Sequence, residues 1–289
     1  MAMILITGAA GKTGKAAIKA LAARGARVRA VVRRPEYAAA LMTLGAAEVA
    51  VARFDDRRAL SQAAAGARAI YHICPNLSPH EAAYARTVSG AALAQSVRCF
   101  VYHSVLHPQI AAMPHHWQKM RVEEMLFAMD FDLTILQPTA YMQNVLGAWR
   151  GAVEEGVFRV PYAVDTRLSL VDLDDVAEVA ARVLTHEGHA GATYELVGTP
   201  PLTQGEVAAA IGATLGRAVR AEAETIEAWD ARAAASGMDE HERTTLGAMF
   251  RYYAAHGLVG NSNVLHGLLG RPPNSLADFL TRAAAMAAS

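Results

Sequence analysis

Three glycines near the start of the chain have the spacing of a loop that binds phosphate. Gly8, Gly11 and Gly14 directly follow an apolar stretch and precede an amphipathic one. A pyrophosphate approaches a backbone closely only where side chains are missing, and the free N–H groups at a helix start attract an anion. The spacing is GxxGxxG rather than GxGxxG, so its place between an expected strand and an expected helix carries the prediction. We expect a dinucleotide site that includes Gly8, Ala10, Gly11, Lys12, Thr13 and Gly14.

Two arginines after the second expected strand favour NADPH over NADH. A site for NAD usually has a carboxylate here that binds the ribose 2′-hydroxyl. This chain has Arg33 and Arg34 instead, and its next carboxylate is Glu36. A planar, permanently charged guanidinium suits a 2′-phosphate. We therefore expect Arg33 to bind that phosphate, with Lys12 as a second cation; the alternative is that both arginines are solvated ends of a strand.

The first half of the chain alternates short apolar stretches with amphipathic ones. The expected strands are 3–7, 26–32, 48–52, 69–73, 99–103 and 132–137, and the expected helices are 13–23, 36–44, 57–65, 80–96 and 117–129. Strands that are apolar throughout are typical of a sheet covered on both faces. Strand and helix alternation gives right-handed βαβ units. The sequence therefore predicts an α/β fold, a Rossmann domain with a doubly wound parallel sheet.

The regular alternation weakens after Pro138. We expect a return to the sheet through a strand at 167–171, a helix at 173–184 and a strand at 193–197, and then helices at 204–215, 225–236, 240–256 and 275–287. This predicts a Rossmann domain over residues 1–150 with a return segment near 167–199. A smaller, mainly helical C-terminal lobe over residues 200–289 is expected on the substrate side.

Composition narrows the class of partner. The 27 Lys and Arg residues balance the 27 Asp and Glu residues, so we expect no contact with nucleic acid. The chain begins directly with an expected strand and lacks a stretch of about 18 apolar residues, so we expect no membrane contact and a cytoplasmic location.

Cys74 and Cys99 lie far apart, which favours free thiols over a disulfide. Pro108 follows His103 and His107, which argues against a helical metal pair, and we expect no metal.

Motifs along almost the whole chain resemble the NmrA-like branch of the atypical short-chain dehydrogenase/reductase superfamily. They are the glycine turn 8–14, Val32-Arg33-Arg34-Pro35, Phe100-Val101-Tyr102-His103-Ser104, Lys119 with Glu123, the stretch 133–138 leading to Met142-Gln143-Asn144, and 269–273 with the closing helix 276–280. The resemblance implies an NADPH-dependent reductase of a small quinone-like, carbonyl or aromatic substrate. The NmrA-like branch also includes regulators that bind the dinucleotide without turning it over.

The chain departs from the family pattern at two places. Gln137-Pro138 stands where relatives commonly carry Arg-Pro. After the third expected strand, residues 52–56 read Ala-Arg-Phe-Asp-Asp where relatives often carry Gly-Asp. The second departure affects the usual contact to the adenine side, and it makes Arg53 a candidate replacement.

The usual proton donor of the superfamily is missing. Ordinary members use a serine and a Tyr-x-x-x-Lys unit, in which the tyrosine delivers a proton. Lys119 and Ser104 occupy the lysine and serine positions, whereas His115 occupies the tyrosine position. Three interpretations stay open: Lys119 binds the ribose and relays a proton, His115 or His116 acts as general acid, or no residue delivers a proton. A quinone or a dye cation needs little acid catalysis, so reduction is compatible with the missing tyrosine.

Further site residues are expected where strands end. Ligands of open α/β sheets bind at the carboxyl edge. We expect Ile73, Cys74, Pro75, Lys119, Thr139 and Tyr141 to contact the cofactor, and Trp117, Tyr141 and Asn144 to contact a flat substrate. The alternatives are packing in the core for the aromatic residues and a small buried apolar role for Cys74.

The sequence therefore predicts a reductase that uses NADP, with NADPH preferred over NADH, and a small-molecule substrate. The alternative is a non-catalytic NADP(H)-binding protein that senses the redox state and passes it to a partner. An epimerase or isomerase is disfavoured, because the tyrosine is missing and no sugar-nucleotide signature is present. A homodimer is left open.

Overall fold

A seven-stranded sheet organises the first part of the chain in this computed structural model, which describes residues 2–287. Its strands are β1 (Met3–Ile6), β2 (Arg27–Val32), β3 (Glu48–Val51), β4 (Ala67–His72), β5 (Cys99–His103), β6 (Asp132–Pro138) and β10 (Thr193–Leu196). Their order is β10-β6-β5-β4-β1-β2-β3, and the pairings from β3 through to β6 are parallel. This is the doubly wound order, and the direction of winding changes between β1 and β4. The predicted fold class is confirmed.

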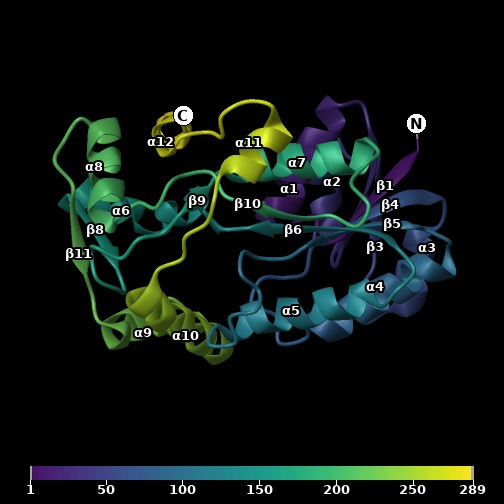
Figure 1. The fold of residues 1–289 in the computed structure, drawn as a ribbon, viewed down its shortest axis with the longest axis horizontal. Coiled ribbons are helices and arrows are strands. Elements are labelled where there is room, and N and C mark those ends of the chain that lie inside the picture. Colours follow the sequence, from purple (N-terminus) through teal and green to yellow (C-terminus); the bar gives the residue numbers. More distant parts are fainter. Residues whose placement is uncertain (1, 288–289) are drawn as a thin grey trace. The chain divides into compact units, whose positions relative to one another are not determined.

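Helices cover both faces of this sheet (Figure 1). On one face lie α3 (Arg57–Ala64), α4 (Glu81–Ala94) and α5 (Pro114–Phe127), and on the other lie α1 (Lys12–Ala23), α2 (Ala38–Thr43) and α7 (Leu173–Thr185). A short 3-10 helix, η1 (Pro35–Tyr37), leads into α2. Right-handed crossovers place successive helices in this way, so the carboxyl ends of the parallel strands share one edge of the sheet.

Contacts within the chain define two compact units. The first comprises the residues up to Gln109 with His115–Gln137 and Val176–Tyr194; the second comprises Ile110–Pro114, Pro138–Asp175 and the residues from Glu195 onward. Residue 150, the boundary expected from the sequence, lies in α6 (Trp149–Glu155) of the second unit.

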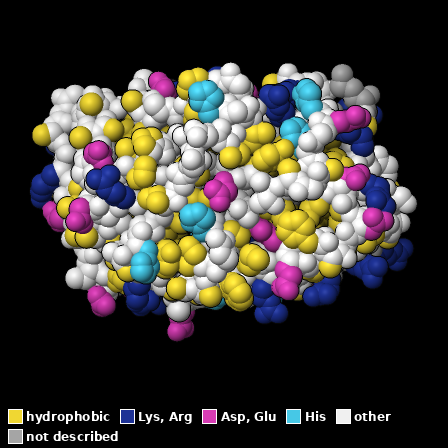
Figure 2. Space-filling model, viewed as in Figure 1, with side chains coloured by type: hydrophobic (Ala, Val, Ile, Leu, Met, Phe, Trp, Pro, Cys, Tyr) yellow, Lys and Arg dark blue, Asp and Glu magenta, His cyan; other side chains and the backbone are white. Residues whose placement is uncertain are grey.

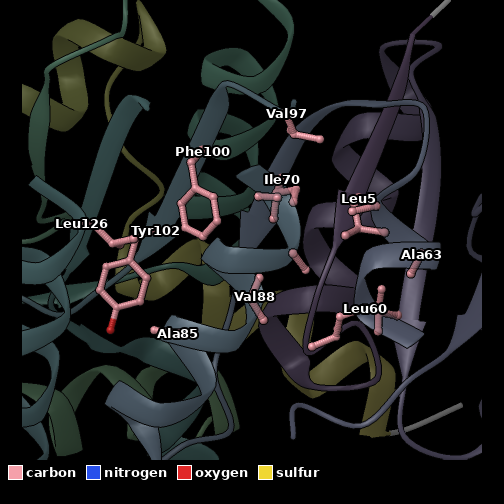
Figure 3. Packing of buried hydrophobic residues seen from close by; sticks show 14 of the residues in the cluster. Leu5, Leu60, Ala63, Ile70, Ala85, Val88, Val97, Phe100, Tyr102 and Leu126 are labelled. Carbon is pink, nitrogen blue, oxygen red and sulfur yellow. The ribbon is translucent and has the colours of Figure 1, made fainter. Parts of the chain in front are cut away.

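The core of the first unit includes apolar side chains between the sheet and the helices α3, α4 and α5. Leu5, Ile70 and Phe100 come from three adjacent strands and are almost completely buried. Figure 3 shows Leu60 and Val88 among these strand residues. Burial of side chains of this size stabilises a fold by about 1.5–3 kcal/mol each, so the apolar strands supply both the sheet and its packing surface.

The second unit contains two short parallel pairs and several helices. Strand β7 (Ala140–Tyr141) pairs with β9 (Leu170–Val171), and β8 (Val157–Val160) pairs with β11 (Arg220–Ala223). The remaining elements are η2 (Met142–Ala148), α8 (Gln204–Leu215), α9 (Ile226–Ala235), α10 (Glu240–His256), α11 (Asn263–Leu269) and α12 (Leu276–Ala287). The strand expected over 167–171 is wrong in extent, because only Leu170–Val171 form a strand and Leu168 makes isolated bridges to Leu202 and Leu258. Strand β11 was not predicted, because Arg-Ala-Glu-Ala lacks a strand pattern.

Two buried aspartates hold the C-terminal segment within the second unit. Asp175 accepts a hydrogen bond from Arg271 at 2.8 Å and another from the backbone N–H of Asn274 at 2.7 Å. Asp172 accepts from the Asn274 side chain at 2.9 Å and from Arg282. Both carboxylates are fully buried. A buried carboxylate needs cations and donors of this kind, so residues 271–282 are structurally tied to residues 172–175.

Charged side chains of both signs are interspersed with hydrophobic ones on the face shown in Figure 2. None of the helices within residues 2–287 combines the length and the apolar character needed to cross a membrane.

Candidate functional site

The glycine turn after β1 has no room for side chains at two of its positions. A Cβ atom on Gly8 would lie 2.5 Å from the carbonyl oxygen of Ile73, and φ at Gly8 is +63°. A Cβ atom on Gly14 would lie 2.5 Å from the Gly8 carbonyl oxygen and 2.6 Å from Cα of Ala9. The turn therefore packs directly against the end of β4 and against the start of α1. Glycine is required here for both the backbone angle and the close approach.

The start of α1 offers backbone donors to an anion. Gly11 is the N-cap residue, and in the described part of the chain no side chain caps this helix or places a carboxylate in its first turn. The first N–H groups of a helix have no intrahelical partner, and the helix dipole adds partial positive charge. Lys12 is exposed beside them. This cradle fits the pyrophosphate of a dinucleotide.

The two arginines after β2 have different surroundings. Arg34 pairs with Glu36 at 2.8 Å, and its guanidinium lies 4.8 Å from the centre of the Tyr37 ring. Arg33 is exposed and has neither a hydrogen bond nor an ion pair with any described residue. Arg53, by contrast, is paired with Asp55 at 2.9 Å and 3.0 Å. Arg33 is thus the arginine in this region whose full charge is available to a ligand.

Lys119 lies in a buried polar cluster formed by β5, α4 and α5. Its Nζ donates to Oε1 of Glu81 at 3.0 Å and to the backbone oxygen of His103 at 3.1 Å. Nζ also lies 5.3 Å from the centre of the Tyr102 ring. The side chain of Lys119 is 14% exposed and that of Glu81 is 4% exposed. The lysine is therefore held in one place by an ion pair that is largely withdrawn from water.

The carboxylate of Glu81 is the centre of this cluster. The Tyr102 hydroxyl donates to the same oxygen, Oε1, at 2.7 Å. Figure 3 shows the Tyr102 ring among the core residues, with its hydroxyl pointing away from Phe100. Desolvation alone raises the pKa of Glu81, but the charge of Lys119 and the hydrogen bonds outweigh it, so the pKa lies below its usual value. Burial and the Glu81 charge raise the pKa of Tyr102 well above its usual value.

Ser104 is hydrogen-bonded to a second buried carboxylate, that of Glu123. Its hydroxyl donates to Oε1 of Glu123. Gln137 donates from Nε2 to both oxygens of Glu123, at 3.0 Å each. Gln137 and Ser104 are uncharged, so this carboxylate is bound by neutral donors. Desolvation raises the pKa of Glu123.

The histidines in the first turn of α5 are neutral at neutral pH. Burial is the largest cause that lowers the pKa of His115, to about 3, and that of His116, to about 4. Nδ1 of His115 has no hydrogen-bond partner among the described residues, while Nδ1 of His116 lies 3.2 Å from the backbone oxygen of His107. An imidazole with such a pKa holds no extra proton to deliver near pH 7.

The remaining predicted residues divide between the two units. In the first unit Ile73 and Cys74 are buried after β4, Pro75 is exposed, and Trp117 is exposed on α5. Burial raises the pKa of the Cys74 thiol, which keeps it protonated. In the second unit Thr139 is buried and donates to the backbone oxygen of Ser169 at 2.9 Å, Tyr141 is half-buried and Asn144 is exposed.

Three members of the buried cluster were not predicted from the sequence. Glu81 and Tyr102 contact each other, and His72 stacks on the Tyr102 ring at 5.9 Å between centres. Nδ1 of His72 lies 2.8 Å from Oγ1 of Thr7. Glu81 looks like an ordinary acidic residue at a helix start, and Tyr102 looks like a core residue of a strand. The isolated Lys119 is the one signal in the sequence of the buried carboxylate that it contacts.

Sequence comparison places these features in a family. The NmrA-like family matches the chain over residues 1–276. The chain belongs to the NmrA-like family. Quinone oxidoreductase 2 of Escherichia coli (strain K12) is 30% identical over 281 residues, which cover 96% of this chain and 98% of that protein. The NAD(P)H azoreductase of Xenophilus azovorans is 28% identical over 286 residues, which cover 96% of each chain.

The fold of this NmrA-like protein is also that of a solved relative. The crystal structure of the NADPH-dependent quinone oxidoreductase of Escherichia coli in complex with NADPH superposes with a TM-score of 0.85 at 29% identity, covering 97% of this chain and 99% of that one. The predicted family and Rossmann fold are therefore confirmed. Among the described residues, no three His, Cys, Asp or Glu side chains are arranged to hold a metal ion.

Proposed function

We propose that this NmrA-like protein is an NADPH-dependent reductase that transfers a hydride to a small quinone-like, carbonyl or aromatic substrate. The observation that carries the proposal is the uncapped glycine cradle at the start of α1, with the unpaired Arg33 in the same unit. The similarity of the chain to a quinone oxidoreductase and an azoreductase, over 96% of the chain in each case, supports the same activity.

The first unit supplies groups for each part of the cofactor. Backbone N–H groups of residues 12–14 would bind the pyrophosphate, since the N–H of Gly11 donates to the Gly8 oxygen. Arg33 would bind the 2′-phosphate, because a free guanidinium forms charge-assisted hydrogen bonds with it. Ile73, Cys74 and Pro75 lie at the carboxyl end of β4, beside the turn, where an open α/β sheet binds ligands. When bound, the cofactor supplies the hydride.

Lys119 is the residue we assign to the nicotinamide side. Its ammonium is fixed by Glu81 and by the backbone oxygen of His103. His115 is neutral and Ser104 is bound to Glu123, so neither offers a ready proton. A quinone or dye cation accepts hydride with little acid catalysis. We therefore propose that Lys119 binds the ribose and that quinone-like acceptors are the preferred substrate class.

The test is NADPH oxidation by the purified protein with a panel of quinones, azo dyes, triphenylmethane dyes and enones. We expect turnover with at least one of these classes and a large loss in Lys119→Met. A folded protein that binds NADPH and oxidises it with none of these classes would overturn the reductase.

A redox sensor is the second candidate, and the neutral His115 at the tyrosine position favours it. A sensor must bind NADPH and NADP⁺ with different affinity, because it reads their ratio. Titration of both forms decides this: equal affinities eliminate the sensor, and unequal affinities without turnover support it.

The finer predictions on environment and assembly stay proposals. Both cysteines are free, which supports a reducing, cytoplasmic compartment. We also propose a small-molecule partner without contact to nucleic acid; a homodimer would be detected by light scattering. Contacts of Thr139 and Tyr141 with the cofactor, contacts of Trp117, Tyr141 and Asn144 with the substrate, and a substrate-side role of residues 200–289 are further predictions.

A further inference from the structure

We infer that Glu81 is a positioning residue that orients the Lys119 ammonium for the cofactor. This inference rests on the proposed function, because it assigns Glu81 a task in the same cofactor site. Glu81 does not itself contact the reacting atoms in this assignment. It acts through Lys119.

The number of hydrogen bonds that Lys119 makes supports this assignment. An ammonium group has three N–H donors. One points to Glu81 at 3.0 Å and a second to the backbone oxygen of His103 at 3.1 Å. Among residues 2–287, no third hydrogen-bond acceptor contacts Nζ. Two fixed acceptors leave the third N–H in a defined direction, available to a ribose hydroxyl.

The carboxylate is in turn held from several sides. The Tyr102 hydroxyl binds Oε1 of Glu81, the same oxygen that Lys119 binds. The Tyr102 ring is stacked on His72, which is fully buried. Glu81 therefore cannot swing away from Lys119 without breaking the Tyr102 contact. A flexible lysine stem becomes a rigid donor only when its partner is rigid.

A purely structural role explains this pair poorly. Burying an ion pair costs desolvation that the attraction between the charges barely offsets, and apolar residues of similar volume are often at least as stable. The position four residues before Lys119 holds the neutral His115 rather than a tyrosine. Glu81, from a different helix, is the charged group that fixes the lysine here.

The test compares NADPH affinity in Glu81→Gln, Lys119→Met and the double variant, using fluorescence of bound NADPH without any substrate. Glutamine keeps the shape and the Tyr102 contact but removes the charge. We expect each single variant to weaken NADPH binding about tenfold, the loss typical of one charge-assisted hydrogen bond. The double variant should be no weaker than Lys119→Met, because Glu81 acts only through Lys119. Glu124→Gln, an exposed carboxylate on α5, is the matched control and should bind as the wild type does.

Two outcomes overturn the inference: unchanged NADPH affinity in a folded Glu81→Gln protein, or losses that multiply in the double variant. If Glu81→Gln does not fold, Tyr102→Phe replaces it, since it keeps the ion pair and removes only the hydroxyl that holds the carboxylate. We then expect a loss of about threefold in NADPH affinity, and unchanged affinity overturns the inference.

Steady-state kinetics distinguish a positioning role of Glu81 from general damage to the fold. Glu81→Gln should raise KM for NADPH and leave KM for the quinone unchanged, whereas a loosened fold would raise both. A wild-type protein without turnover contradicts the proposed function alone, because the affinity arm tests Glu81 independently of chemistry.

Discussion

Arg33 and Arg34 show how two adjacent residues of one type acquire different roles. Arg34 forms an ion pair with Glu36, and its planar guanidinium lies over the ring of Tyr37. Arg33, one position earlier, points to solvent without a partner among the described residues. The difference arises because the chain turns into η1 immediately after Arg34, which brings the next side chains back to that residue.

The first prediction concerns these two arginines. Arg33→Ala should weaken NADPH binding by about 10- to 100-fold, because hydrogen bonds to a charged group contribute about 1.5–3 kcal/mol. NADH lacks the 2′-phosphate, so its affinity should change by less than about threefold. Titration of both cofactors against Arg33→Ala measures the difference, and Arg34→Ala is the control with little effect on either. Equal losses for NADPH and NADH in Arg33→Ala would refute the 2′-phosphate role.

The sequence revealed site residues that depend on local structure and missed those that depend on distant contacts. The glycine turn and Arg33 are recognisable because a strand, a turn and a helix follow one another within a short stretch. Glu81 and Tyr102 meet across 21 positions of sequence, and Lys119 meets Glu81 across 38. Such pairs depend on the order of strands in the sheet, which a single sequence does not contain.

At the scale of elements, the turn between β1 and α1 constrains the site most tightly. Three backbone segments converge there: the turn itself, the end of β4 and the first turn of α1. The winding order of the sheet creates this convergence, since β1 and β4 are neighbours and their connections leave in opposite directions. The same logic explains the missed strand β11, whose pairing with β8 joins residues 63 positions apart.

The second prediction compares two helical glycines of the first unit. Gly14→Ala should lower the free energy of unfolding by about 1–3 kcal/mol, because its Cβ overlaps the backbone of Gly8 and Ala9. It should also abolish most NADPH binding, because the turn must move. In Gly90→Ala on α4, the Cβ meets only Arg57 side-chain atoms at 3.9 Å or more.

Gly90→Ala should raise stability by up to about 1 kcal/mol, as alanine favours a helix over glycine, and leave cofactor affinity unchanged. Urea unfolding and NADPH titration measure both effects. If Gly14→Ala binds NADPH as well as Gly90→Ala does, the close-packed turn is not needed for the cofactor.

At the scale of the whole molecule, buried histidines set how stability responds to pH. His72 and His103 are buried, and desolvation lowers their pKa to about 4 and about 3. In the unfolded chain a histidine titrates near pH 6.5. The unfolded state therefore binds more protons below that pH. The contribution of these two histidines to stability is fully present above about pH 6.5 and is lost as the pH falls toward 4 and 3.

The third prediction follows from this sign. Each of these histidines should remove about 1.4 kcal/mol of stability per pH unit below about pH 6. Urea unfolding at several pH values measures the slope. Glu123 and Asp175, whose pKa burial raises, act in the opposite sense.

His72→Asn should reduce that slope by the contribution of one titrating group, about 1.4 kcal/mol per pH unit. The substitution His266→Asn, at an exposed position, should leave the slope unchanged. A slope in His72→Asn equal to that of the wild type would contradict the assignment, whatever the absolute stability of the variant.

The aspartates at 172 and 175 also impose an order on the synthesis of the chain. Their partners Arg271 and Arg282 follow 96 and 110 residues later. The ribosome delivers the N-terminal residues first, and the sheet that organises the first unit is complete at Leu196. A nascent chain that ends before Arg271 has no cation with which to bury either carboxylate. The first unit can thus close on the ribosome, whereas the second closes only when the last helix has emerged.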